Sequence, residues 1–178
     1  SDLVVQRIIK NHDILAVYSN FGYTPFAKKR DTNIEKVCKK LNVEFHQFHD
    51  YGLLPIGEVT TSNGVYKKFT PYYLAAKNKK IPKPIKYSLT NLVKIKNNNI
   101  PLEKYYKHPS KIIQQELKAG GRKNGLVLLG KNYSGYDKNR NILHINTTQF
   151  SAYIKFGCIS IREVYHSIRS GDLVKQLF

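Results

Sequence analysis

The sequence of 178 residues has no Trp, no Met and two Cys, and it contains no long apolar run. A membrane-spanning helix needs roughly 20 consecutive apolar residues, so none is expected. Cys38 and Cys158 lie far apart, and His46 and His49 have no further ligand at metal-binding spacing. With no signal peptide visible, these absences predict a soluble protein of a reducing intracellular compartment without a metal site.

Acidic residues are also scarce, since 12 Asp and Glu stand against 30 Lys and Arg, which gives a formal net charge of +18. Such an excess favours a polyanionic partner, above all nucleic acid. Of the basic residues 24 are Lys and 6 are Arg, and ammonium groups attract phosphates without reading bases. We therefore expect DNA as a partner, bound without regard to sequence. A solvated basic surface with no partner is the alternative.

The N-terminal part reads as helix, strand, helix and strand. Residues 3–9 have helical spacing of apolar side chains, whereas residues 14–18 form a short apolar run typical of a buried strand. Thr24 and Pro25 start the next helix, and residues 43–48 give a second strand. The apolar stripe of that helix consists of Ile34, Val37, Cys38 and Leu41. A strand, helix and strand in this order predict a parallel sheet of an α/β, Rossmann-like fold.

The composition then changes in a way that divides the chain. Thr70 and Pro71 open another helix, after which residues 79–109 are rich in Lys, Asn and Pro and poor in apolar side chains. Such a segment is typical of an interdomain linker. We predict a partial α/β domain over residues 1–78, the linker, and the first helices of an all-α domain over residues 110–178.

Residues 125–132 nearly match the phosphate loop of nucleotide hydrolases, with Gly125, Gly130 and Lys131 in register. Asn132 stands where that loop has the hydroxyl that holds magnesium, and bulky apolar residues fill its centre. We interpret the segment as the buried face of a broken helix over residues 110–129. No Gly-x-Ser-x-Gly elbow is present either, so hydrolysis is not expected.

Residues 136–165 contain two helix starts. Asn146 is expected to cap a helix whose first free amides favour a bound phosphate, and these amides belong to Thr147, Thr148 and Gln149. One face of this helix would carry Phe150, Tyr153 and Ile154, and Gly157 would end it. Ser160 begins the second helix with a capping box to Glu163.

These motifs resemble the start of the flavin-binding domain of the DNA photolyase and cryptochrome family. Tyr136 and Arg140 match its Tyr-x-x-x-Arg element, residues 147–151 its Thr-Ser-x-Leu-Ser-like helix start, and residues 156–162 its Phe-Gly-x-Ile-Ser-x-Arg pattern. Two upstream segments match in the family's order, namely residues 20–31, which resemble the N-terminal antenna domain, and residues 64–72.

The resemblance implies FAD as the cofactor. The implied contacts to the flavin are Tyr136, Thr147, Thr148, Gln149, Phe150 and Ser151. Among them the Thr and Ser residues would donate amides and hydroxyls to the flavin diphosphate, and Gln149 and Phe150 would add backbone contacts. Arg140 would contact DNA. A folate antenna is not implied, because Phe26 and Ala27 stand where folate-binding members carry an Asn-Glu pair, and the resemblance leaves the identity of any other antenna chromophore open.

Intact members of this family use light to pass an electron from reduced FAD to a pyrimidine dimer flipped out of the duplex. The cofactor performs the electron transfer, so no catalytic side chain is implied. We expect a partial photolyase of the cyclobutane-dimer type that binds little FAD and is inactive alone, because the family's tryptophan relay and later helices are missing. The alternatives are a cryptochrome-like or six-four photolyase flavoprotein and a non-catalytic, basic nucleic-acid-binding remnant.

We further expect a fragment or split gene product that needs a complementary polypeptide to supply the rest of the FAD domain. The second helix of residues 136–165 has an apolar stripe that little remaining chain could cover, namely Ile161, Val164, Tyr165 and Ile168. An uncovered stripe invites association. Homodimerisation through the same stripe is the competing outcome.

Overall fold

The computed structural model describes residues 1–85, 90–93, 104, 119–168 and 170–178. The part of the broken helix that was predicted over residues 110–118 lies outside these residues. Among the described residues, no helix is both long enough and apolar enough to cross a lipid bilayer.

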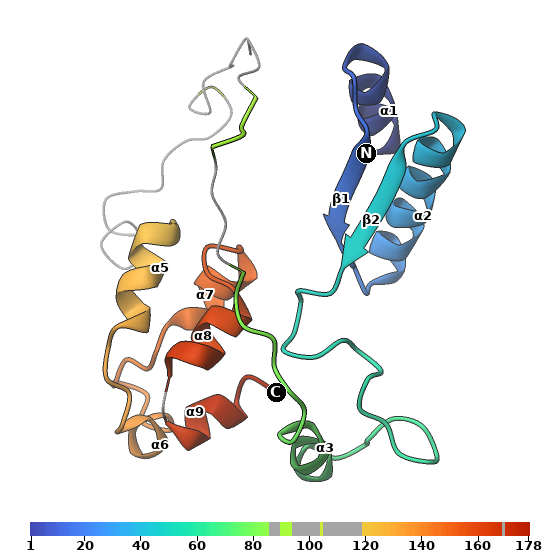
Figure 1. The fold of residues 1–178 in the computed structure, drawn as a ribbon. Coiled ribbons are helices and arrows are strands. Elements are labelled where there is room, and N and C mark those ends of the chain that lie inside the picture. Colours follow the sequence, from blue (N-terminus) through green and yellow to red (C-terminus); the bar gives the residue numbers. More distant parts are fainter. Residues whose placement is uncertain (86–89, 94–103, 105–118, 169) are drawn as a thin grey trace.

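An α/β unit forms from α1 (Asp2–Asn11), β1 (Ala16–Asn20), α2 (Pro25–Lys40) and β2 (Glu44–Phe48), as Figure 1 shows. The two strands are parallel, with Ala16 opposite Glu44 and Asn20 opposite Phe48. The predicted order of elements and the parallel pairing are therefore confirmed. The first strand begins two residues later than the apolar run predicted, at Ala16.

Local signals explain where α2 begins. Thr24 Oγ1 accepts a hydrogen bond from the Ala27 amide at 3.2 Å, and Pro25 occupies the first turn, where its missing N–H costs nothing. Lys39 and Lys40 in the last turn complement the helix dipole. The predicted cap and stripe are confirmed.

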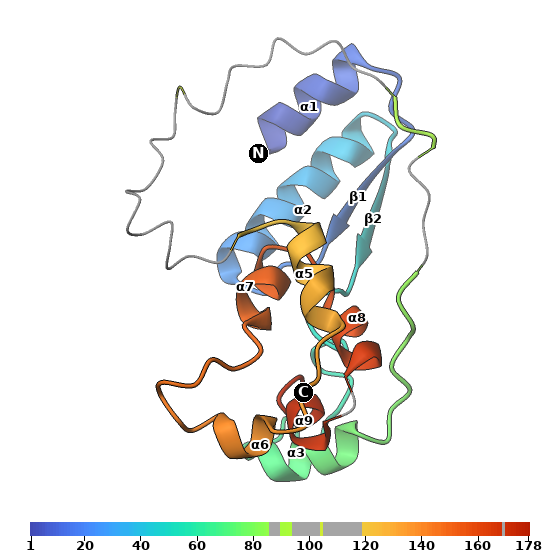
Figure 2. The same cartoon turned by 90° about the vertical axis from the view of Figure 1, so that its left-hand side faces the viewer.

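Both helices of this unit cover the same face of the sheet (Figure 2). We call the apolar cluster between them the sheet core; its members are Val5, Ile9, Ile14, Val17, Ile34, Val37, Cys38, Leu41, Val43 and Phe45. Side chains alternate across a strand, so Tyr18 and Phe48 point to the other face and are exposed. The sheet of the described residues has one covered face and one open face.

After β2 the chain runs through a loop to α3 (Phe69–Ala76). Loop and helix bury a second cluster, the middle core, whose buried members are Leu53, Leu54, Ala76 and Ile81. Partly buried side chains from the C-terminal helices complete it, namely Ile161, Tyr165, Leu177 and Phe178. The middle segment is thus tied to the C-terminal helices by apolar packing. The predicted domain boundaries at residues 78 and 109 stay predictions.

The C-terminal part is helical, with α5 (Arg122–Leu129), α6 (Tyr136–Asn139), α7 (Phe150–Lys155), α8 (Ile161–Ser167) and α9 (Gly171–Lys175). We call its apolar cluster the helix core; the buried members are Phe150, Tyr153, Ile159, Val164, Ile168 and Leu173. The predicted face of Phe150, Tyr153 and Ile154 is confirmed, because all three pack in this core.

The predicted uncovered stripe on α8 is wrong. Val164 is 0% exposed and Ile168 is 8% exposed in the helix core. Ile161 and Tyr165 pack instead against the middle core, where Leu177 and Phe178 lie beside them. The chain returns over α8 after α9, so its own last residues cover the stripe. Association through the stripe loses its basis.

The segment that resembled a phosphate loop belongs to α5. Gly125 is buried in this helix, and a Cβ atom there would lie 2.8 Å from Ile159 Cγ2 and 3.1 Å from Tyr153 Cδ1. This glycine allows close helix packing and does not form a phosphate-binding turn. The predicted buried face is only partly right, since Leu126 and Val127 are exposed.

Candidate functional site

Four of the six predicted flavin contacts line one hollow of about 390 Å³, namely Tyr136, Thr147, Thr148 and Gln149. Tyr136 comes from the start of α6, and the other three come from the extended segment before α7. Leu128, Lys131, Asn132 and Tyr133 form the opposite wall. Small-molecule sites range from about 300 to 1,000 Å³, so the hollow is large enough for part of a cofactor.

The segment before α7 differs from the prediction. Its helix begins at Phe150, and the capping position is Gln149, not Asn146. Gln149 has a left-handed backbone with φ 57°, which breaks the helical path before it. The Asn146 Oδ1 atom accepts from Gln149 Nε2 at 3.1 Å, and Thr148 Oγ1 accepts from the Phe150 amide at 3.4 Å.

This geometry changes the expected chemistry of the segment. The predicted first-turn amides of residues 147–149 precede the helix, and α7 is a short helix of 6 residues. The attraction for an anion would therefore come from hydroxyls, amides of an irregular segment and a nearby cation. That cation is Lys131, which lines the same hollow.

Phe150 and Ser151 are not part of the hollow's lining. Phe150 is 3% exposed, and its ring packs edge-to-face on Tyr133 with 5.2 Å between centroids. Ser151 is exposed on α7. The structure therefore assigns Phe150 a packing role beneath the hollow and leaves the predicted cofactor contact of Ser151 a prediction.

Arg140 follows α6 and is exposed, outside the lining of the hollow. Its amide donates to the Tyr136 carbonyl at 2.9 Å, so one helical turn links the two residues. A guanidinium at this place is accessible to a phosphate. The predicted DNA contact of Arg140 stays a prediction.

Tyr133, Lys131 and Asn132 also line the hollow, although the sequence did not predict them there. Lys131 and Asn132 drew notice only at the end of the segment that resembles a phosphate loop. All three also line a neighbouring hollow of about 880 Å³ toward α9. Tyr133 Oη donates to the Leu128 carbonyl at 2.8 Å, and burial raises the pKa of this phenol. It therefore stays a neutral wall between the hollows. The sequence signal that could have indicated Tyr133 as a site residue is its spacing of three residues from Tyr136.

The histidines of β2 and its end lie against other side chains. His46 Nε2 lies 2.7 Å from Glu44 Oε2, and His49 Nδ1 lies 2.5 Å from Tyr23 Oη. Within the described part of the chain, no group of three or more His, Cys, Asp or Glu side chains could hold a metal ion.

Comparison with known proteins identifies the relationship. The family model described as DNA photolyase matches residues 1–88. A deoxyribodipyrimidine photo-lyase of Alkalihalophilus pseudofirmus is 30% identical over 171 residues, which cover 90% of this chain and 36% of that protein. This chain belongs to the DNA photolyase and cryptochrome family.

Solved structures agree with this assignment. An archaeal photolyase of Sulfolobus tokodaii, described with two FAD molecules, superposes with a TM-score of 0.78 at 28% identity over 99% of this chain and 39% of that chain. A class III photolyase of Agrobacterium tumefaciens superposes with a TM-score of 0.83 at 19% identity, and the match covers 99% of this chain and 40% of that chain. This likeness shows the shared fold. The chain thus spans well under half the length of the relatives it matches.

Proposed function

We propose that this chain is the part of a DNA photolyase that begins the FAD site, in a protein that repairs cyclobutane pyrimidine dimers with light. The observation that carries the proposal is the meeting of Tyr136, Thr147, Thr148 and Gln149 in one hollow. The family motif independently implies the same residues as flavin contacts. Bound FAD would supply the electron for repair, and the protein would hold and orient it.

The donor set of the hollow suits an anionic group. Two threonine hydroxyls, the carboxamides of Asn132 and Asn146, and the Lys131 ammonium line it. Among the residues that line it, none is an Asp or Glu, so no carboxylate there repels a diphosphate. We infer that Thr147, Thr148 and Lys131 hold the diphosphate and that Tyr136 packs against the cofactor.

A binding experiment tests this assignment. The chain is titrated with FAD and with riboflavin, which lacks the diphosphate, alone and mixed with the downstream half of a close relative. We expect weak FAD binding alone, strong binding in the mixture, and an FAD affinity reduced about tenfold by Lys131→Gln, the loss of one charge-assisted contact. The control is Lys155→Gln, because Lys155 is exposed on α7 away from the hollow. Equal affinities for riboflavin and FAD would contradict the diphosphate site.

The complementary polypeptide and the repair of DNA are part of this proposal. Relatives are more than twice as long, so a partner or continuing chain would enclose the flavin ring. Blue-light repair by the mixture, absent from either half alone, is the expected result. A homodimer with no flavin would favour a degenerate remnant. Repair of six-four lesions, or light response without repair, would favour the six-four photolyase or cryptochrome alternative.

The net charge of +18 favours a second candidate function, binding of nucleic acid without catalysis. Both candidates expect DNA affinity that falls steeply with salt. They differ in the effect expected of Arg140→Gln. On a photolyase surface this change should reduce the preference for damaged over undamaged DNA. On a general basic surface it should lower DNA affinity no more than Arg7→Gln does, because Arg7 is simply an exposed arginine of α1.

A further inference from the structure

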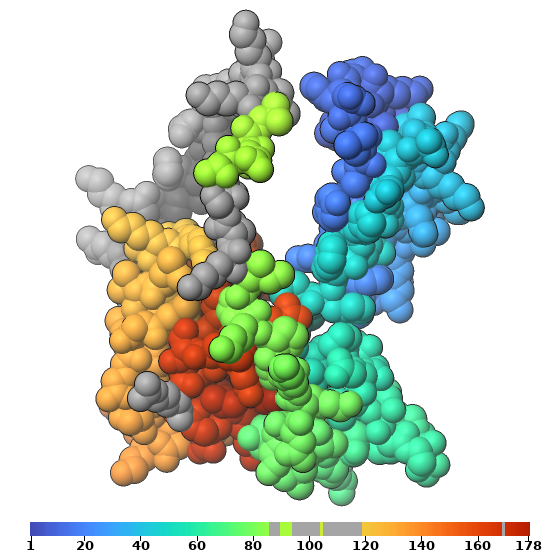
Figure 3. Space-filling view, in the orientation of Figure 1, coloured from blue at the N-terminus to red at the C-terminus, as the bar shows by residue number. Residues whose placement is uncertain are grey.

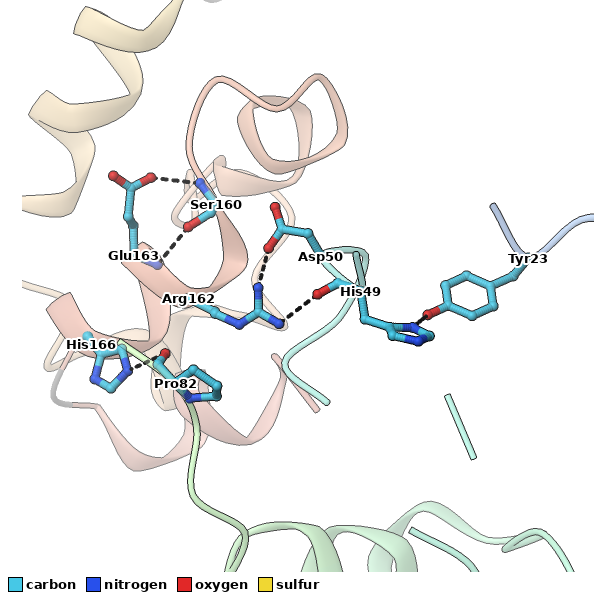
Figure 4. Close-up of polar contacts among 8 residues, drawn as sticks. All are labelled: Tyr23, His49, Asp50, Pro82, Ser160, Arg162, Glu163 and His166. Atoms are coloured by element: carbon cyan, nitrogen blue, oxygen red, sulfur yellow. Dashed lines mark hydrogen bonds and ion pairs between the residues drawn. The ribbon is translucent and has the colours of Figure 1, made fainter. Parts of the chain in front are cut away.

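Helix α8 is the place where three parts of the chain meet. Its Val164 side chain lies in the helix core, while His166 Nε2 lies 3.1 Å from the Pro82 carbonyl oxygen of the middle segment. Arg162 and Glu163, which are neighbours in the sequence, point in different directions (Figure 4). Glu163 pairs with Arg122 of α5 at 2.6 Å, and Arg162 reaches the end of β2.

Arg162 holds the end of β2 with both terminal nitrogens. Its Nη2 donates to the His49 carbonyl at 2.8 Å, and its Nη1 pairs with the Asp50 carboxylate. The Arg162 side chain is 17% exposed, so water screens this contact less than it screens an ordinary surface ion pair. A planar guanidinium suits a carbonyl and a carboxylate side by side, which an ammonium could not bind in the same way.

These bonds cross between regions with separate apolar cores. The sheet core consists of side chains from residues 5–45, whereas the middle and helix cores share Leu177 and lie over α3 and the C-terminal helices. On the face shown in Figure 3, the α/β unit approaches the rest of the molecule near the ends of its strands. Apolar packing therefore fixes each region internally, and polar contacts bear on how the α/β unit docks.

Both ends of the contact are held in place. The His49 ring stacks on Phe21 with 4.2 Å between centroids. Its Nδ1 atom shares a hydrogen bond of 2.5 Å with Tyr23 Oη. On the other side, the Ser160 and Glu163 capping box fixes the first turn of α8. A side chain supported in this way at both ends transmits orientation and does not simply solvate a surface.

The Arg162 Nε atom is buried and has no hydrogen-bond partner among the described residues. A buried N–H without a partner is unfavourable, so the position is poorly explained by solubility alone. We propose that Arg162 is a clasp that docks the α/β unit on the helical unit and sets their relative orientation. This inference does not depend on the proposed flavin or DNA function.

The test uses the full chain and its Arg162→Ala variant. Hydrogen exchange is measured for the amides of residues 49–52, and small-angle X-ray scattering gives the radius of gyration. We expect unchanged helical circular dichroism, exchange about tenfold faster at this junction, as for loss of one charge-assisted bond, and a larger radius of gyration. Arg7→Ala, which removes an exposed arginine from α1, is the control and should change neither quantity.

Two further variants keep the test decisive. Arg162→Lys retains the charge but not the planar fork, and we expect it to open the junction part of the way. If Arg162→Ala loses helical signal, Asp50→Asn decides, because Asp50 is partly exposed and the change preserves its shape. Unchanged exchange and scattering in the folded variants would overturn the clasp. Recovery of the compact form by the exchanged pair Arg162→Asp with Asp50→Arg would support it.

Discussion

The α/β unit leaves large side chains exposed on one face of its sheet, whereas the helical unit encloses the side chains at its centre. In the helical unit Ile159 and Val164 are 0% exposed. In the α/β unit Tyr18 is 65% and Phe48 is 55% exposed, and their rings stack on the open face with 6.2 Å between centroids. A helix pairs its backbone within itself, whereas a parallel sheet ordinarily needs cover on both faces. A short helical segment can therefore enclose a core, whereas a two-stranded sheet with helices on one side leaves its other face exposed.

The largest difference is expected from truncation of side chains in the two units. Ile159→Ala should lower the free energy of unfolding by about 2–5 kcal/mol, because it leaves a cavity in the helix core. Tyr18→Ala on the open sheet face should change it by less than about 0.5 kcal/mol. Urea unfolding followed by circular dichroism measures both. Equal losses would mean that the open face is covered in solution.

A methyl group added to the helix core should have a smaller effect. Gly125→Ala brings Cβ within 2.8 Å of Ile159 Cγ2, and the fully buried Ile159 has little room to move. Overpacking costs about 1–3 kcal/mol and helix propensity returns up to about 1 kcal/mol, so we expect a net loss of about 1 kcal/mol. Gly120→Ala is the control, since nothing lies within 4 Å of its added Cβ. Stabilisation by Gly125→Ala would show that α5 shifts away from α7.

Removal of a helix cap should lower the free energy of unfolding by a similar amount in the two units. Thr24→Ala at α2 and Ser160→Ala at α8 each remove a side-chain acceptor for an amide of the first turn. Each should cost about 1 kcal/mol, because a cap acts locally whatever its helix packs against. Thermal unfolding of the two variants checks this. A much larger loss for Ser160→Ala would add weight to α8 as the docking helix.

The smallest expected effect is a dependence on pH that belongs to the helical unit. The Arg122 hydrogen bond, with the Ser160 amide, lowers the pKa of Glu163 below its ordinary value of 4.5. The folded pKa is below the unfolded one, so this stabilisation is present above the unfolded pKa and is lost as pH falls through the folded pKa. Melting temperatures of the wild type and Glu163→Gln should converge as pH falls below about 4. A constant difference between them down to pH 3 would contradict this linkage.

The two cysteines differ in burial. Cys38 is 0% exposed in the sheet core, and burial raises the pKa of its thiol, whereas Cys158 is partly exposed. We expect a thiol reagent at neutral pH to modify Cys158 first and Cys38 only on unfolding. Rapid modification of Cys38 in the native chain would mean that α1 and α2 separate readily from the sheet.

The sequence by itself determined what depends on neighbours in the chain. The caps at Thr24 and Ser160 and the turn at Gly157, which has φ 66°, follow from residues a few positions apart, and the order of strand, helix and strand predicted the parallel pairing. The family motif likewise predicted that Tyr136 and Thr147 belong to one site, and both line the same hollow. The caps and the turn are local features, because hydrogen bonds and backbone preferences within a few residues decide them.

Only the tertiary structure decided how distant segments meet. The left-handed backbone of Gln149 delays α7 to Phe150, and the last residues of the chain cover the α8 stripe. Arg162 meets Asp50 across 112 positions of sequence. No spacing rule encodes such a contact, because its geometry depends on the packing of whole helices against the end of a strand.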